Sequence, residues 1–174
     1  GSDPILKRMR RNHTLAAYLE KVHYLQEVVK GVEISTDLIV GYPGETEEDF
    51  EQTLYCLRDV RFSQVFPFKY SVRPGTTAAG EADDVPREVK EERLARVIAL
   101  QEEINEARQE SLAGSIQEVL IDAAHPRRRG WMNGRTDGYR AISVHADGLE
   151  IGDLVPVRVT GHQGHWLLSE PVTD

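Results

Sequence analysis

The sequence predicts an incomplete α/β array of parallel βα units, followed by a small antiparallel β-barrel. Helical and strand-like patterns alternate up to about residue 112, as they do in parallel βα units. After Gly114 the pattern changes to short runs rich in Val, Ile, Leu and aromatic residues, which Gly, Asn and Asp separate. The first part offers two strands. Because two strands cannot bury both faces of a sheet, we expect the α/β part to belong to a larger assembly of strands and helices.

The elements of the first part follow from apolar periodicity and capping residues. They are expected to be a helix (14–30), a buried strand (32–42), a helix (45–60), a strand (62–72), a loop (74–86) and a long helix (87–112). Thr14 and Thr46 are good N-caps, and the acidic residues after Thr46 favour the positive end of the helix dipole. Gly31 suits the end of the first helix. Pro67 argues against a place in the middle of a regular ladder.

The second part reads as about five strands in roughly 60 residues. The runs are SIQEVLIDAA, WMNGRT, YRAISVHA, DLVPVRVTG and HWLLSEPV. The domain boundary is therefore expected between residues 112 and 113, which gives an α/β domain over 5–112 and a barrel domain over 113–174. The opening GSDP is expected to be a cloning remnant.

Composition excludes several classes of protein. The net charge of −8 argues against a general polyanion binder, so any nucleic-acid contact must be local. No apolar run approaches the length of a membrane span, and no membrane partner is expected. The single cysteine, Cys56, excludes an intramolecular disulfide and indicates a reducing, cytoplasmic compartment. The six histidines show no metal-ligand spacing, so no metal site is expected in this chain.

Candidate binding residues lie where the two predicted strands end. Ligands of parallel α/β arrays bind beyond the carboxyl ends of the strands. This rule selects Val40 and Gly41, with Asp37 inside the strand, and Tyr70 and Arg73 at the end of the next strand. Each has a structural alternative: a tight turn for Gly41, a carboxylate satisfied by a nearby group for Asp37, and a surface ion pair for Arg73.

Arginines alternate with aromatic residues in the second part. Guanidinium groups suit phosphates and aromatic rings stack on bases, so the mixture suits single-stranded RNA. The candidate RNA-binding residues are Arg127, Arg128, Arg129, Trp131, Arg135 and Arg140, with Tyr139 as a further stacking partner. The alternative is a solvated loop beside core aromatics.

Five segments together resemble one family. MRRNHT, STDLIVGYPGETEEDFEQTL, FKYSVRPGTTAA, VPREVKEERLARVIALQEEI and a final barrel containing GRT occur in this order. They resemble the carboxyl-terminal half of the radical-SAM methylthiotransferases, which implies that the first part is a partial, incomplete radical-SAM barrel. The final domain resembles a TRAM domain, an OB-like RNA-binding barrel. YSVRPGT points to the tRNA-modifying branches and, most closely, to the branch that adds a methylthio group at C2 of isopentenyladenosine 37. The branch acting on threonylcarbamoyladenosine stays an alternative.

The resemblance implies cofactors and a partner. Family members use S-adenosylmethionine and two [4Fe–4S] clusters, whose cysteines this chain lacks, so the fragment alone is expected to be inactive and to bind no cluster. A 5′-deoxyadenosyl radical would abstract hydrogen from adenine C2 in the full-length parent. The implied partner is the anticodon stem-loop of tRNA. In the broader superfamily, the corresponding strand often carries the motif G-x-I-x-G-x-x-E. This sequence departs from the motif, because Asp37 stands at its first Gly position and Glu45 lies one residue later than its Glu.

Two further expectations follow. The exposed edge and face of the partial sheet favour a homodimer of the fragment. A stand-alone RNA-binding module, with the α/β part as scaffold only, is the alternative from a different functional class.

Overall fold

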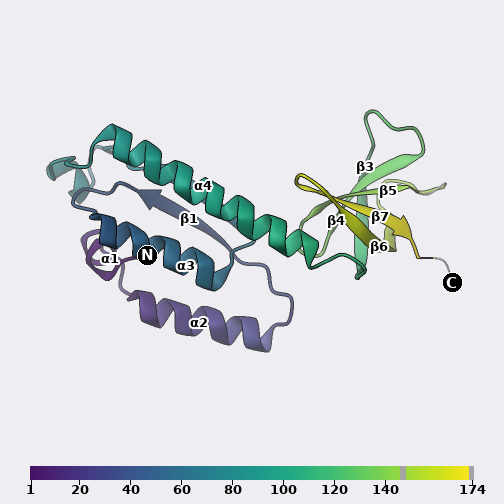
Figure 1. Ribbon diagram of the computed structural model, residues 1–174, viewed down its shortest axis with the longest axis horizontal. Coiled ribbons are helices and arrows are strands. Elements are labelled where there is room, and N and C mark those ends of the chain that lie inside the picture. The colour runs from purple at the N-terminus through teal and green to yellow at the C-terminus, as the bar shows by residue number, and fades with distance from the viewer. Residues whose placement is uncertain (146–147, 173–174) are drawn as a thin grey trace. The chain divides into compact units, whose positions relative to one another are not determined.

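The computed structural model describes residues 1–145 and 148–172. The first part contains α1 (Asp3–Arg8), α2 (Leu15–Val28), β1 (Ser35–Val40), α3 (Glu47–Val60), β2 (Gln64–Lys69), the 3-10 helix η1 (Thr77–Gly80) and α4 (Arg87–Glu110) (Figure 1). The second part contains β3 (Ile116–Ala124), β4 (Trp131–Thr136), β5 (Ala141–His145), β6 (Leu154–Gln163) and β7 (Trp166–Pro171). The predicted fold class is confirmed. Sequence patterns had not indicated α1 or η1.

The chain divides into two compact units, Gly1–Ile104 and Asn105–Asp174. Helix α4 runs across this division without a break. The boundary expected between residues 112 and 113 therefore stays a prediction.

Capping residues set the helix starts of the first unit. The Thr14 hydroxyl accepts a hydrogen bond from the Ala17 N–H (3.2 Å) at the start of α2. Thr46 and Asp49 form a reciprocal capping box at the start of α3. Ser2 caps α1 in the same way, by accepting from the Ile5 N–H. Each cap satisfies backbone donors that the first helical turn leaves unpaired.

One face of the β1–β2 sheet carries the core of the first unit. The strands pair in parallel, and the apolar side chains of this face pack against α2, α3 and α4. The buried residues of this core, from both the strands and the helices, are Val22, Val40, Phe50, Leu54, Cys56, Leu57, Val60, Phe62, Val65, Val97 and Ile104. Cys56 is thus a small buried apolar residue of this core.

The opposite face of this sheet is open. Asp37 and its neighbour Phe66 are exposed, as are the paired residues Ile39 and Phe68. The expectation of a wholly buried strand was therefore wrong for this face, and exposed Asp37 needs no partner to offset desolvation. Pro67 lies inside β2, which pairs on one side only, and a free strand edge is where proline is tolerated.

The second unit is a closed barrel with strand order β3-β4-β5-β7-β6. Its interior holds Val119, Ile121, Ile142, Val144, Val157, Val159 and Leu167. The predicted barrel was antiparallel, but β5 pairs with β7 in parallel. The reason is topological, since a closed ring of five strands cannot alternate direction at every step.

Within the described ranges, no helix combines the length and the apolarity that crossing a bilayer requires.

Candidate functional site

A cavity of about 760 Å³ opens at the carboxyl ends of β1 and β2. Parallel strands end at one edge of their sheet, so the residues that follow each strand meet there. The cavity is lined by Arg8, Met9, Arg10, Ile39, Tyr42, Phe68, Lys69, Tyr70, Ser71, Arg73, Thr76, Thr77 and Ala78. Its wall thus combines the end of α1, both strand ends and the loop that leads to η1.

Two tyrosines brace the wall of this cavity. The rings of Tyr42 and Tyr70 meet edge to face, with centroids 5.3 Å apart. The Tyr70 hydroxyl donates to the Ala78 carbonyl (3.2 Å), and the Tyr42 hydroxyl donates to the Arg8 carbonyl (3.4 Å). Burial raises the pKa of Tyr42 above its ordinary value. The two rings therefore tie the strand ends to α1 and to the η1 segment.

The turn after β1 requires glycine at its first position. Gly41 has φ of +71°, in the region that L side chains rarely adopt. A Cβ there would lie 2.3 Å from Cγ of Lys90. The buried Lys90 ammonium in turn lies 2.5 Å from an Asp83 carboxylate oxygen and 5.3 Å from the centroid of the Tyr70 ring. A side chain at Gly41 would displace this lysine.

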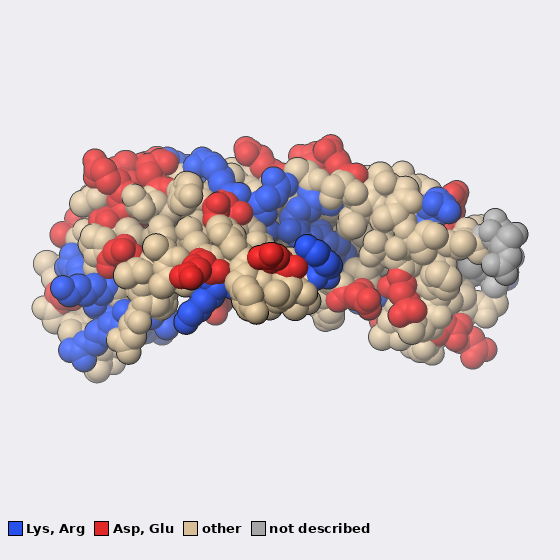
Figure 2. All heavy atoms as spheres, turned by 90° about the horizontal axis from the view of Figure 1, so that it is seen from below, with Lys and Arg blue, Asp and Glu red and all other residues tan. Residues whose placement is uncertain are grey.

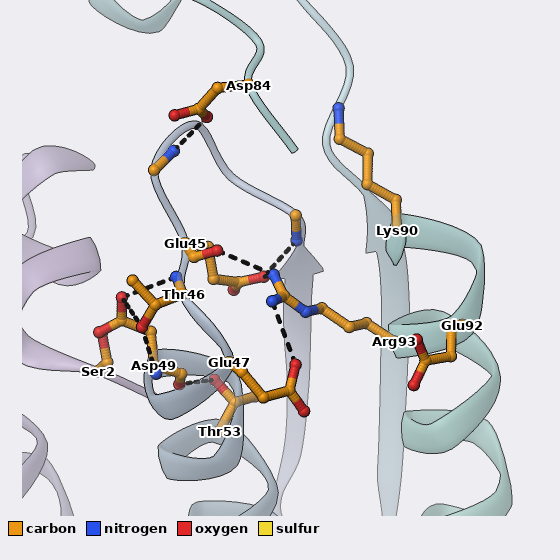
Figure 3. A network of polar contacts seen from close by, with 12 residues as sticks. Ser2, Glu45, Thr46, Glu47, Asp49, Thr53, Asp84, Lys90, Glu92 and Arg93 are labelled. Atoms are coloured by element: carbon orange, nitrogen blue, oxygen red, sulfur yellow. Dashed lines mark hydrogen bonds and ion pairs between the residues drawn. The ribbon is translucent and has the colours of Figure 1, made fainter. Parts of the chain in front are cut away.

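A buried ion pair holds the same turn onto α4 (Figure 3). The Glu45 carboxylate accepts hydrogen bonds from the Gly41 N–H (2.6 Å) and from Nη1 of Arg93 (2.8 Å). Arg93 also donates to the Glu45 carbonyl (3.1 Å) and to Glu47 (3.2 Å). Glu45 and Arg93 are 6% and 4% exposed. Burial raises the pKa of the Glu45 carboxyl, while the Gly41 amide and the Arg93 cation lower it.

Four cationic side chains line the cavity, those of Arg8, Arg10, Lys69 and Arg73. Two of them form ion pairs with carboxylates. Arg8 pairs with Glu81, and Lys69 pairs with Glu91 at 2.9 Å. Hydrogen bonds from Lys69 and Arg87 lower the pKa of Glu91 to about 2. Figure 2 shows basic side chains gathered at the left end of the view, the end at which Figure 1 places α1.

The predicted pocket residues fall in different places. Tyr70 and Arg73 line the cavity. Val40 is buried in the core, and its carbonyl accepts the Tyr70 N–H (2.8 Å). Gly41 is buried in the turn, and Asp37 lines a second, smaller cavity of about 370 Å³ beside α1, α2 and α3. Their role as a cofactor and substrate pocket stays a prediction.

Sequence reasoning missed several residues that line the cavity. Arg8 and Arg10 come from the segment around α1, and Phe68 and Lys69 come from the end of β2. Arg10 belongs to MRRNHT, which was noticed only as a part of the family pattern. The signal available in the sequence was the pair of adjacent arginines, Arg10 and Arg11, in that segment.

The barrel carries a loop of exposed arginines between β3 and β4. Nδ1 of His125 accepts the backbone N–H groups of Arg127 (3.1 Å) and Arg128 (3.0 Å), which fixes the start of the loop. The Arg128 guanidinium lies over the Trp131 ring, 5.2 Å from its centroid. Arg129 is exposed beside them.

A second pair of arginine and aromatic residues lies at the end of β4 and in the turn that follows it. The Arg135 guanidinium is 5.0 Å from the centroid of the Tyr139 ring and 3.4 Å from Asp122. Tyr139 is exposed and has φ of +60°. The nearby Arg140 is half-buried. The predicted pairing of guanidinium groups with aromatic rings is thus present in the structure at two places, and its role in RNA binding stays a prediction.

The residues of this chain do not fit an iron–sulfur cluster. Such clusters require several cysteine thiolates, and the chain has one cysteine, which is buried in α3. In the described part of the chain, no group of three or more His, Cys, Asp or Glu residues could hold a metal ion.

Comparisons with known proteins match both units. The family model of the radical SAM superfamily matches residues 1–57, and that of the TRAM domain matches residues 110–172. A protein of Geobacter sulfurreducens is 42% identical over 100% of this chain and 39% of its own length. One of Alkalilimnicola ehrlichii is 46% identical over 98% of this chain and 38% of its own length. Both are named tRNA-2-methylthio-N(6)-dimethylallyladenosine synthase.

A relative from Streptomyces coelicolor carries the same name and is 41% identical over 98% of this chain, which covers 35% of that protein. The chain thus spans less than two fifths of the length of these relatives. The radical SAM match begins at residue 1, and Ser2 caps α1. The expectation that GSDP is a cloning remnant was therefore wrong.

Proposed function

Because the chain belongs to the radical SAM methylthiotransferase family, we propose that it acts as part of an enzyme that adds a methylthio group to adenosine 37 of tRNA. The observation that carries the proposal is the identity of about 42% to the synthases over the whole chain. In this role the first unit supplies part of the cofactor and substrate barrel, and the second unit binds the RNA.

The first unit contributes the strand ends at which the substrate would lie. We propose that Asp37, Val40, Gly41, Tyr70 and Arg73 belong to the pocket for S-adenosylmethionine and the target nucleoside. Aromatic rings and a guanidinium group are the chemistry that a nucleoside with a charged tail requires, and Tyr70 and Arg73 line one cavity. When bound, S-adenosylmethionine and the clusters supply the radical chemistry. This chain's own task is to bind and orient, through a turn that Glu45 and Arg93 hold rigid.

The clusters require ligands from outside this chain, because one cysteine cannot supply three thiolates. We therefore expect anaerobic reconstitution of the chain with iron and sulfide to give no stoichiometric [4Fe–4S] cluster by absorbance. Formation of such a cluster, with reductive release of 5′-deoxyadenosine, would contradict this assignment of roles.

The barrel is proposed to bind the anticodon stem-loop through Arg127, Arg128, Arg129, Trp131, Arg135 and Arg140. If three arginines contact phosphates, they contribute about 2 to 3 to the negative slope of log affinity against log salt concentration. Replacing Arg127, Arg128 and Arg129 together by Ala should flatten that slope. Trp131→Ala should lower the affinity and leave the slope nearly unchanged, because stacking does not release counterions. Unchanged binding by the triple variant would contradict the assignment.

Two further proposals complete the function. The chain is proposed to form a homodimer when its open sheet face has no other cover, since Ile39, Phe66 and Phe68 are exposed there. We also propose a cytoplasmic location, because the proposed substrate is tRNA.

The test of the whole proposal is nucleoside mass spectrometry of tRNA from a strain that lacks the full-length gene. We expect 2-methylthio-N6-isopentenyladenosine to disappear and N6-isopentenyladenosine to accumulate. Retention of the methylthio group there, with loss of methylthio-threonylcarbamoyladenosine, would instead assign the chain to the other tRNA-modifying branch.

A further inference from the structure

Arg10 has a backbone conformation that favours glycine. It follows the C-cap of α1 and has φ of +56°. The Arg10 N–H donates to the Lys7 carbonyl (3.0 Å), and the Arg11 N–H donates to the Leu6 carbonyl (2.9 Å). This is the Schellman arrangement, in which the left-handed residue is usually Gly because any Cβ costs free energy. Helix stability alone therefore does not explain an arginine at this position.

The side chain of Arg10 lines the cavity at the strand ends, as does that of Arg73. Arg8 and Lys69, the other two cations of the wall, are paired with Glu81 and Glu91. Among the described residues, no carboxylate or hydrogen-bond acceptor pairs with the guanidinium of Arg10 or of Arg73. Two exposed guanidinium groups are thus available to an anion from outside the chain.

The cavity also offers an apolar, aromatic surface beside these cations. Phe68 is 55% exposed and its strand neighbour Ile39 is 39% exposed, both on the open face of the sheet. Tyr42 and Tyr70 close the wall next to them. A flat ring beside guanidinium groups fits a nucleotide, whose base stacks while its phosphate pairs with a charge.

We propose that Arg10 and Arg73 bind phosphate groups of an RNA strand whose base lies against Phe68. The inference rests on the proposed function and deepens it, because it adds phosphate contacts of the RNA strand to the nucleoside pocket of the first unit. The arginine fork suits a phosphodiester through two parallel hydrogen bonds. The strand would be unpaired where it enters, since only a splayed base reaches the aromatic surface.

The test uses Arg10→Gly and Arg73→Gln in the whole chain, with binding of an anticodon stem-loop RNA measured at several salt concentrations. Arg10→Gly relieves the strained backbone, so it should raise the thermal midpoint while it weakens RNA binding. Each variant should reduce the salt slope by about 0.7, the value per phosphate for a single strand, and the double variant by about 1.4. A gain in stability together with a loss of binding cannot come from misfolding.

Arg61→Gly is the matched control. Arg61 is likewise a left-handed residue at a helix end, with φ of +53° after α3, and it does not line the cavity. Its substitution should leave the salt slope unchanged. An equal effect of Arg61→Gly and Arg10→Gly would overturn the proposal, because the loss would then reflect net charge alone.

Two further outcomes separate this inference from the proposed function. If the triple alanine variant of Arg127, Arg128 and Arg129 loses binding while Arg10→Gly and Arg73→Gln bind normally, the phosphate site is wrong and RNA binding by the barrel stands. Adenosine monophosphate is the small-ligand probe, and we expect it not to displace the RNA. Displacement that Arg10→Gly abolishes would assign the site to a free nucleotide and overturn the RNA assignment.

Discussion

The two sheets of this protein differ in how they cover their apolar residues. The barrel closes on itself, and its inward side chains, such as Val119, Ile142 and Leu167, are fully buried. The parallel sheet of β1 and β2 has helices on one face, while Ile39, Phe66 and Phe68 are exposed on the other. Strand closure thus makes the second unit self-sufficient, whereas the first unit keeps an apolar face that only additional protein or a ligand could cover.

The difference has consequences for how each unit is stabilised. In the barrel, every strand has two hydrogen-bonded neighbours, so apolar packing and ladder bonds support each other. In the first unit, polar side chains must fix the strand ends. The ion pair between Glu45 and Arg93 joins residues 48 positions apart, and it holds the turn after β1 onto α4. The comparison predicts that the two units respond to different substitutions.

The largest effect is expected from Arg93→Met. This substitution leaves the buried Glu45 carboxylate without its cation, and breaking a buried ion pair in this way typically costs about 3–5 kcal/mol. Urea unfolding followed by the helical far-UV signal should show the loss, because α1 to α4 begin in the first unit. Both tryptophans, Trp131 and Trp166, lie in the barrel, so their fluorescence transition should stay nearly unchanged.

Leu167→Ala should destabilise the barrel and leave the first unit nearly unchanged. Removing a fully buried leucine from a closed core typically costs about 2–5 kcal/mol, and Leu167 is 0% exposed. Tryptophan fluorescence should therefore report a lower urea midpoint, while the helical signal retains most of its transition. If both probes move together in both variants, the units unfold as one, and the comparison between them fails.

The effect of Arg93→Met should depend on pH. Burial already raises the pKa of the Glu45 carboxyl above its ordinary value of 4.5, and loss of the arginine raises it further. A carboxyl group with a raised folded pKa favours the folded state at low pH, and this contribution is lost as pH rises through that pKa. The stability gap between wild type and variant should thus narrow as the pH falls from neutral through the raised pKa of the Glu45 carboxyl in the variant. Glu45→Gln in the Arg93→Met background should remove this dependence.

The smallest change in stability is expected from Phe66→Ser and Phe68→Ser on the open face. Exposed substitutions usually change the free energy of unfolding by less than about 0.5 kcal/mol. Their effect should instead appear in self-association, measured by sedimentation over micromolar to millimolar concentrations. A wild-type chain that stays monomeric throughout this range would contradict the proposed dimer.

The sequence determined the local structure of this protein well. Thr14 and Thr46 mark the helix starts because a side-chain oxygen can cap only the donors next to it. The turn at Gly41 and the strands of the barrel could also be predicted from the sequence, since positive φ and alternating burial depend on neighbouring residues. The five segments indicated the family, because a family resemblance is recognised from the order of residues along the chain and does not require knowledge of contacts in the fold.

Tertiary structure alone decided which distant residues meet. Tyr42 and Tyr70 form one wall because two parallel strands end at the same edge. Glu45 meets Arg93 only when α4 packs beside the turn, and no local pattern encodes that contact. Asp37, predicted inside a buried strand, lies on an open face because the chain supplies two strands to this sheet. Local interactions fix helices, turns and caps, whereas burial and ion pairing depend on which surfaces the whole fold brings together.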